Sequence, residues 1–306
     1  VHAADRQATL VASVYPPFAL TCGVIMAGTI LWSALGTHDQ IPYLKRVEVA
    51  PAGRSVWSVL AGVFRDLAEA IGNVSFRWLF AGVLIVFVMV GVQSALNLYM
   101  GNYFWELTSE ELRWLTLAAP AGFLLGAPFT RRLNRRFDKK PSLVIGPAWY
   151  AVFQLSPPVL RLLGLFPGND HPGLVPLLVG MSVVGGFGVV QAIVSAGSMM
   201  ADIADEHELK THRRQEGIFF GALAFSGKGA SGLGNLVGGV GIDLIAFREN
   251  AVPGEVPPAT LVRLGLLYGP VVMGFAVAAV WCYGHYALTR GRHQEILEAT
   301  RKNEPQ

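Results

Sequence analysis

The sequence predicts an all-α membrane protein with seven transmembrane helices. Of its 306 residues, 52% are hydrophobic and only 15% are charged, with a mean hydropathy of +0.44. The charges are grouped, and the apolar runs between the groups approach or exceed the roughly 20 residues with which a helix crosses a bilayer. Soluble domains carry about 25% charged residues, so this composition excludes an ordinary soluble enzyme. The net charge of +3 is too small to indicate a nucleic-acid-binding protein.

Seven runs that carry almost no charge are the candidate spans, and only the sixth contains charged residues, Lys228 and Asp243. In chain order they are residues 14–36, 79–103, 114–130, 142–160, 173–201, 217–247 and 264–289. The two cysteines, Cys22 and Cys282, both lie inside such runs, so no disulfide framework or metal-binding spacing is predicted.

The distribution of Lys and Arg predicts the orientation of these spans. Alternate connections, namely 37–78, 131–141, 202–216 and the tail after 289, hold 18 of the 24 basic residues. The opposite side holds five, and Lys228 lies within a span. Since cytoplasmic loops carry the excess of basic residues, we expect the C-terminus to be cytoplasmic and the first span to begin outside. We therefore expect a multi-pass membrane protein.

The first run begins with Tyr15, Pro16 and Pro17, and residues 1–13 lack a basic segment followed by an apolar one. An external N-terminus without an export signal predicts that an odd number of helices precedes this chain. A complete seven-span protein is the alternative.

The connection 37–78 contains a further predicted helix. Its apolar residues recur at three- and four-residue intervals, at Val56, Trp57, Leu60, Val63, Phe64, Leu67 and Ile71. This pattern predicts an amphipathic helix on the inner membrane surface with Arg65, Asp66 and Glu69 facing water, or else a soluble linker helix. The domain organisation follows as one leading span in 1–36, the linker 37–78, a six-helix block in 79–289 and a tail in 290–306.

Lys228 lies near the middle of the sixth run, where a charge costs about 2.5–3.5 kcal/mol on insertion scales. We expect it to face a bundle interior or cavity, as a contact for solute or coupling ion or as an ion pair between helices. Asp243, nearer the outer end, is either a pathway residue or a solvated helix end. The glycines around Lys228 indicate close helix packing, because small residues let helices approach.

Amide side chains inside other spans form a second candidate set. Gln93 and Asn97 lie one turn apart in the second run, and Gln191 has Ser195 one turn later in the fifth. Amides hydrogen-bond sugar hydroxyls, and they also bond neighbouring helices to one another, so both interpretations stay open.

Two polar connections are candidates for gating. The basic connection contains Arg135, Arg136, Lys139 and Lys140, and the acidic one contains Asp202, Asp205, Arg214 and Glu216. His207 and His212 lie in the acidic connection, but their spacing does not predict a metal site.

The segment from Met199 to Asn235 resembles the region of helices ten and eleven in the glycoside-pentoside-hexuronide:cation symporters, the melibiose-permease-like branch of the major facilitator superfamily. The resemblance rests on these residues: Asp202, Asp205, Lys210, Thr211, Arg214, Glu216, Gly217 and Lys228. The segment RRFDKKP also resembles that family's loop between helices eight and nine, although Asp138 and Asn134 differ from the usual pattern. The resemblance covers about residues 14–290.

The resemblance implies helices 6–12 of a twelve-helix fold, and it implies no enzymatic activity. It implies symport of a sugar or glycoside with Na+ or H+ by alternating access, with the cation site mainly in the missing N-terminal helices. Lys228 matches the family's lysine in helix eleven, which implies a place near the sugar and cation sites. The expected partners are therefore the lipid bilayer, a small-molecule sugar and the missing helices, and no cofactor is expected. The alternatives are a complete seven-helix receptor-like protein and a nonfunctional remnant of a transporter.

Overall fold

The computed structural model describes residues 15–43, 55–211, 215–248, 251–288, 291 and 295, and every regular element within them is helical. Contacts divide the chain into two compact units, residues 1–61 and 62–306, and each is described by itself. In the smaller unit, α2 (Tyr15–Gly36) carries no charged side chain and is followed by the short 3-10 helix η3 (His38–Tyr43). Helix α3 (Val56–Gly72) begins there and continues into the larger unit.

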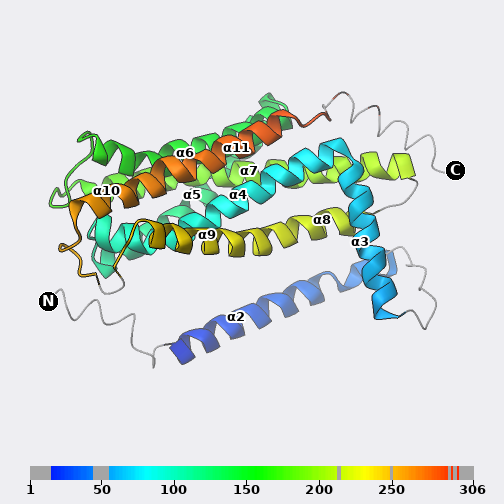
Figure 1. Cartoon of the computed structure of the whole chain (residues 1–306). Helices are drawn as coiled ribbons and strands as arrows, with labels where there is room; N and C mark the ends of the chain where they lie inside the picture. The colour runs from blue at the N-terminus through cyan, green and yellow to red at the C-terminus, as the bar shows by residue number, and fades with distance from the viewer. Residues whose placement is uncertain are drawn as a thin grey trace. The chain divides into compact units, whose positions relative to one another are not determined.

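The larger unit is a helix bundle. Its long helices run side by side, and α4 and α11 lie next to one another (Figure 1). Helices α5 and α6 pack on α7, α9 packs on α4, and α11 packs on both α4 and α6. The elements are α4 (Val74–Tyr99), η4 (Met100–Phe104), α5 (Ser109–Arg136), α6 (Lys139–Leu162), α7 (Leu174–Thr211), α8 (Glu216–Phe225), η5 (Ser226–Ala230), α9 (Ser231–Leu244), α10 (Pro258–Leu266), η6 (Leu267–Val271) and α11 (Val272–Gly284).

Six helical segments of the described residues are long and apolar enough to cross a membrane. They are Pro16–Gly36, Val74–Phe104, Ser109–Asn134, Lys139–Leu162, Leu174–Thr211 and Pro258–Gly284. The remaining predicted span is the helical segment formed by α8, η5 and α9, which is not among the six. Its many glycines, together with Lys228 and Asn235, lower its hydropathy. The all-helical membrane fold is thus confirmed, and the count of seven spans stays a prediction.

Two predicted connections are shorter than expected. The loop prediction for 202–216 is wrong over its first ten residues, because α7 continues to Thr211. Charges one turn apart support this extension, as Lys210 Nζ lies 2.8 Å from Glu206 Oε1. The basic connection 131–141 is helical to Arg136 and again from Lys139, which leaves two residues between α5 and α6.

Glycine residues set the closest helix crossings. An added Cβ on either partner would collide with the backbone of the opposing helix, so only glycine permits these approaches. Three crossings pair glycine with glycine: Gly91 with Gly234, Gly122 with Gly186, and Gly146 with Gly188. These contacts join α4 to α9, α5 to α7, and α6 to α7.

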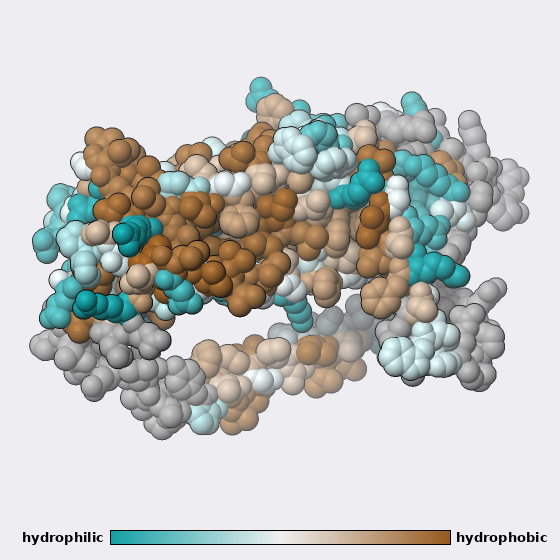
Figure 2. Space-filling model, viewed as in Figure 1, coloured by the Kyte–Doolittle hydropathy of each residue, from teal (hydrophilic) through white to brown (hydrophobic). Residues whose placement is uncertain are grey.

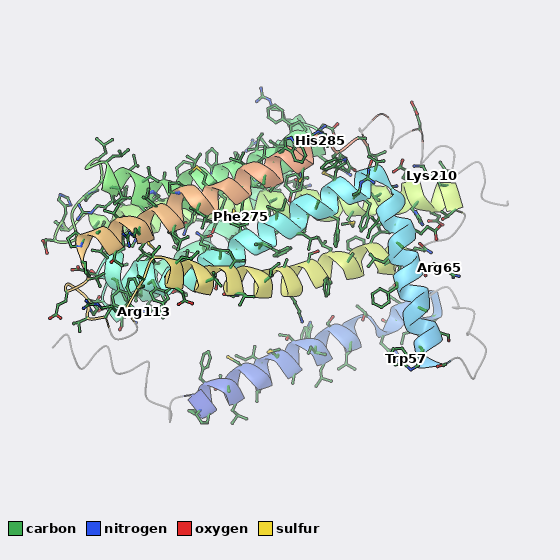
Figure 3. The ribbon with its side chains drawn as sticks, in the orientation of Figure 1. Trp57, Arg65, Arg113, Lys210, Phe275 and His285 are labelled. Atoms are coloured by element: carbon green, nitrogen blue, oxygen red, sulfur yellow. The ribbon has the colours of Figure 1, made fainter. Side chains whose placement is uncertain are left out.

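The surface of the bundle fits a membrane environment. Figure 2 shows apolar side chains over the middle of its visible face and hydrophilic ones towards the ends. Large apolar residues such as Leu124 and Leu244 are about four-fifths exposed, at 79% and 80%. We call the end where α5 ends and α6 begins the basic end. Lys210 and His285 lie towards this end, and Arg113 lies at the opposite one (Figure 3).

Candidate functional site

A buried polar network joins α4, α6 and η6 in the interior of the bundle. Gln93 Nε2 donates a hydrogen bond to the hydroxyl of Tyr268 at 2.9 Å, and this hydroxyl donates to Asn97 Oδ1 at 2.7 Å. The Tyr150 hydroxyl donates to Gln93 Oε1. Gln93 and Asn97, which the sequence placed on one helical face, are therefore connected through a tyrosine of another helix.

Neither tyrosine was among the predicted site residues. Tyr268 lies in the π-helical turn η6, which also contains Pro270. Because proline has no N–H to donate to the carbonyl four residues earlier, it favours a local departure from α-helical bonding. Tyr150 lies near the middle of α6. A tyrosine in mid-span needs a partner for its hydroxyl, and this was the available signal, since interfacial tyrosines lie at span ends.

A cavity of about 150 Å³ lies next to this network, towards the end opposite the basic end. Its polar lining comes from Asn97, Thr116, Gln154, Ser182 and Tyr268, together with the ring of Trp105. None of its lining residues is Asp, Glu, Lys, Arg or His. A lining of neutral hydrogen-bonding groups and an aromatic ring suits an uncharged, hydroxylated solute.

A second cavity, of about 130 Å³, is apolar and is lined mainly by α4 and α7. Tyr150 lines this cavity and Tyr268 lines the polar one, and both bond to Gln93. The network therefore separates a polar from an apolar cavity.

Lys228 lies in the π-helical turn η5, and its side chain is exposed in the described structure. Asp243 is exposed at the end of α9. The same segment has two kinds of glycine: Gly234 and Gly238 contact α4, whereas a Cβ added at Gly232 or Gly239 would meet nothing within 4 Å. Lys228 therefore does not take part in the packing of the bundle.

Gln191 lies between helices. It is buried, and its Nε2 donates to Asn134 Oδ1 at 2.8 Å and to Ser195 Oγ at 3.2 Å. The bond to Asn134 joins α7 to α5. Both hydrogens of the amide nitrogen are thus used within the protein, so no solute is needed to satisfy them.

Two adjacent lysines connect three helix ends at the basic end. Lys139 Nζ lies 2.6 and 2.8 Å from the two carboxylate oxygens of Asp202, which joins α6 to α7. Lys140 Nζ donates to the backbone carbonyls of Gly284 and Tyr286, at 2.7 and 2.9 Å, where α11 ends. A cation at a helix C-terminus is favourable, because the last carbonyls there lack helical partners.

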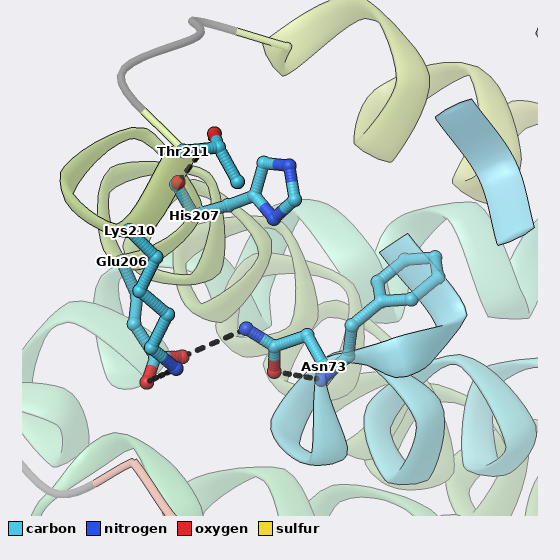
Figure 4. A network of polar contacts seen from close by, with 6 residues as sticks. Asn73, Glu206, His207, Lys210 and Thr211 are labelled. Carbon is cyan, nitrogen blue, oxygen red and sulfur yellow. Dashed lines mark hydrogen bonds and ion pairs between the residues drawn. The ribbon is translucent and has the colours of Figure 1, made fainter. Parts of the chain in front are cut away.

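Glu206 and His207, at the end of α7, bind the neighbouring elements (Figure 4). Asn73 Nδ2 donates to Glu206 Oε2 at 3.0 Å, and Lys210 donates to the other oxygen. The buried His207 is 3.0 Å from Gln215 Oε1, which precedes α8, and 3.9 Å from Glu69 of α3. The connection from α3 to α4 is therefore fixed to α7.

The structure describes the side chains of three other predicted gating residues. Asp205 is half-buried on α7, while Arg136 and Glu216 are exposed. Arg214 and the side chain of Arg135 lie outside the described residues.

Tyr286 follows α11 at the basic end. Burial raises the pKa of its phenol far above the ordinary value, and the nearby carboxylates of Asp202, Glu206 and Asp138 raise it further. Its hydroxyl is buried and has no hydrogen-bond partner among the residues that the structure describes.

The chain matches the family described as MFS/sugar transport protein over residues 3–290. It is 24% identical to the uncharacterized symporter sll1374 of Synechocystis sp. (strain ATCC 27184 / PCC 6803 / Kazusa), over 94% of this chain and 51% of that protein. It is 26% identical to the uncharacterized symporter YjmB of Bacillus subtilis (strain 168), over 68% of this chain and 42% of that protein. The chain thus spans about half the length of the curated relatives it matches.

Proposed function

Since the chain belongs to the MFS/sugar transport protein family, a family of membrane transporters and not of enzymes, we propose that it forms the C-terminal part of a sugar:cation symporter. In this proposal its helical segments correspond to helices 6–12 of twelve. Residues 1–36 supply the last helix of the first half, 37–78 the linker, 79–289 the second half and 290–306 the cytoplasmic tail. The length of the curated relatives, about twice that of this chain, supports this assignment.

The polar cavity carries the proposal for the solute. Its lining of amides and hydroxyls around Tyr268, beside the Trp105 ring, offers both donors and acceptors without a full charge. A neutral sugar or glycoside meets this chemistry through its hydroxyls and the apolar face of its ring. Asn97 is exposed next to the cavity, and we place it as the first contact of an entering solute.

We assign Lys228 to the pathway between the two halves. Its exposed position in an apolar segment has no stabilising contact in the described structure, and such a charge needs a partner or water inside a membrane. The coupling cation is Na+ or H+, and its site lies mainly in helices outside this chain. Asp243 lies further along the same segment, nearer the outer end.

The ion pairs at the basic end keep the half-transporter together. Lys139, Lys140 and Asp202 join α6, α7 and α11 to one another. Because these bonds lie within a single unit, we propose that they let it rock as one body around a midplane site during alternating access. The excess of basic residues supports a cytoplasmic position for this end and for the C-terminus, in a bacterial inner membrane.

A protection experiment tests the assignment of the cavity. In the complete transporter with Cys22→Ser and Cys282→Ser, we expect a maleimide to label Asn97→Cys and a transported sugar to slow that labelling. Lys228→Ala should abolish cation-coupled uptake and leave membrane insertion intact. Labelling that no sugar slows contradicts the cavity assignment, and wild-type accumulation by Lys228→Ala contradicts the role of the lysine.

The same experiment separates this proposal from its competitors. A nonfunctional remnant takes up no solute against a gradient, and a receptor-like protein binds a ligand without accumulating it. The match to a transporter family favours transport over a receptor-like function, and the uptake measurement decides between a working transporter and a remnant.

A further inference from the structure

Helix α3 has three different sides in the part that belongs to the larger unit. Leu67 and Ala70 pack into the hydrophobic core at the basic end. Phe64 and Ile71, two turns apart on the neighbouring side, are 69% and 40% exposed. Arg65 (Figure 3), one residue after Phe64 and so about 100° further around the helix, is exposed on a third side. The helix therefore keeps an apolar flank outside the core, next to the side that the core buries.

Polar contacts join α3 and the start of α4 to α7. Glu69 lies 3.9 Å from His207 of α7, and Asn73, which caps α4, donates to Glu206 at 3.0 Å. Arg65 and Glu69 are exposed, as the sequence predicts, whereas Asp66 is half-buried and does not simply face water. These contacts fix the rotation of α3, so Phe64 and Ile71 cannot turn inwards.

Aromatic side chains indicate the depth of this end in the membrane. Trp78 near the start of α4 stacks with His285 at a centroid distance of 4.7 Å and meets Trp281 at 5.3 Å. Trp281 is 58% exposed. Exposed tryptophans at the ends of spans mark the membrane–water interface. Trp78 lies five residues after Asn73, so α3 ends about 7 Å of helix rise from this aromatic level.

Helix α3 lies across the end of the bundle, at a steep angle to α4 (Figure 1). A helix across the ends of spanning helices, at interface depth, lies in the plane of the membrane surface. Its apolar flank then meets the boundary between headgroups and acyl chains, while Arg65 and the exposed Arg77 lie at headgroup level. On this outer surface Arg65 and Arg77 carry positive charge, and the exposed Glu69 lies beside His207.

We propose that the Phe64–Ile71 flank of α3 binds an anionic phospholipid surface. Phe64 and Ile71 insert into the interface, and Arg65 and Arg77 pair with lipid phosphates. Since α3 is joined to α7 through Glu69 and His207, lipid binding holds the linker at the membrane surface next to the end of α7.

Spin labels measure this directly in the full chain with Cys22→Ser and Cys282→Ser, reconstituted in vesicles of phosphatidylglycerol and phosphatidylcholine. Labels at Phe64→Cys and Ile71→Cys should collide more with dissolved oxygen than with a water-soluble nickel chelate. A label at Arg65→Cys, one residue away on the other flank, should show the reverse. A nickel preference at position 64 means that this side faces water, and protection from both reagents means that protein covers it. Either result overturns the proposal.

A second measurement with the same spin labels tests whether insertion depends on the charge of the lipid headgroups. Vesicles of phosphatidylcholine alone should shift the label at position 64 towards water. In anionic vesicles, Arg65→Gln and Arg77→Gln should each weaken insertion roughly fivefold. A label whose depth does not change with headgroup charge, or with these variants, contradicts the role of anionic lipid.

Discussion

Removing the hydroxyl of Tyr268 tests the polar network most sharply. Tyr268→Phe keeps the ring and deletes the oxygen that accepts from Gln93 and donates to Asn97. Gln93 is 2% exposed, so its amide nitrogen is left in the interior without an acceptor. Asn97 is exposed, and water replaces its lost donor. The variant therefore leaves one buried donor, Gln93 Nε2, without its acceptor.

An orphaned buried donor costs about 1–3 kcal/mol, so the free energy of unfolding in detergent should fall by that amount. The matched control is Tyr286→Phe, which deletes a buried hydroxyl without a hydrogen-bond partner in the described part of the chain. This control should leave the free energy of unfolding unchanged or raise it slightly, because it removes an unsatisfied polar group.

The same variant should weaken solute transport. One net hydrogen bond of about 0.5–1.5 kcal/mol corresponds to a two- to twelvefold rise in the half-saturating solute concentration. Purified protein in a denaturant titration gives the first quantity, and uptake by the complete transporter gives the second. If Tyr268→Phe and Tyr286→Phe behave alike in both assays, the network does not have the role assigned to it.

Three further variants test other parts of the structure. Lys139→Met removes the ion pair with Asp202, which is nearly buried, and should lower the free energy of unfolding by about 2 kcal/mol. Adding Asp202→Leu should restore part of this loss, and strictly additive effects would contradict the pairing. Gly234→Ala should destabilise the protein by about 1–3 kcal/mol in a denaturant titration, because the added Cβ collides with α4. The control Gly239→Ala should not destabilise it, because a Cβ there has open space. Equal effects of the two variants would contradict the close crossing of α4 and α9. Stability should fall as the pH rises above about 10, since tyrosines of the unfolded chain deprotonate there while the raised pKa of Tyr286 keeps its proton in the folded chain. Tyr286→Phe should lessen this fall in a pH series of unfolding curves, and an unchanged pH profile would contradict it.

Composition and hydropathy predict most of the fold, because the bilayer dictates the length of its spans. Six candidate spans coincide with predicted runs, and the helical segment around Lys228 corresponds to the seventh. Hydropathy does not predict the end of a helix that continues into a charged segment. The segment from Asp202 to Thr211 has many charged residues, as polar loops do. It is nevertheless helical, and ion pairs one turn apart, such as that of Glu206 with Lys210, stabilise the helix.

Part of the candidate polar network could be anticipated from the sequence. The one-turn spacing of Gln93 and Asn97 placed both on one face, and the structure adds the tyrosines that connect them. No pattern within α6 or η6 relates Tyr150 to Tyr268, because their meeting depends on how α4, α6 and η6 pack. Likewise, Lys139 and Asp202 are separated by 63 residues, and only the packing of α6 on α7 brings them together.

The most direct test of sugar:cation symport is solute accumulation by cells that express the complete transporter. Labelled α-galactosides and glucuronides would be supplied with and without an imposed Na+ or H+ gradient, to wild type and to Tyr268→Phe. The proposal predicts accumulation above the external concentration only with a gradient, and a higher half-saturating concentration for the variant. No gradient-dependent accumulation of any sugar, or identical uptake by the variant, would contradict it.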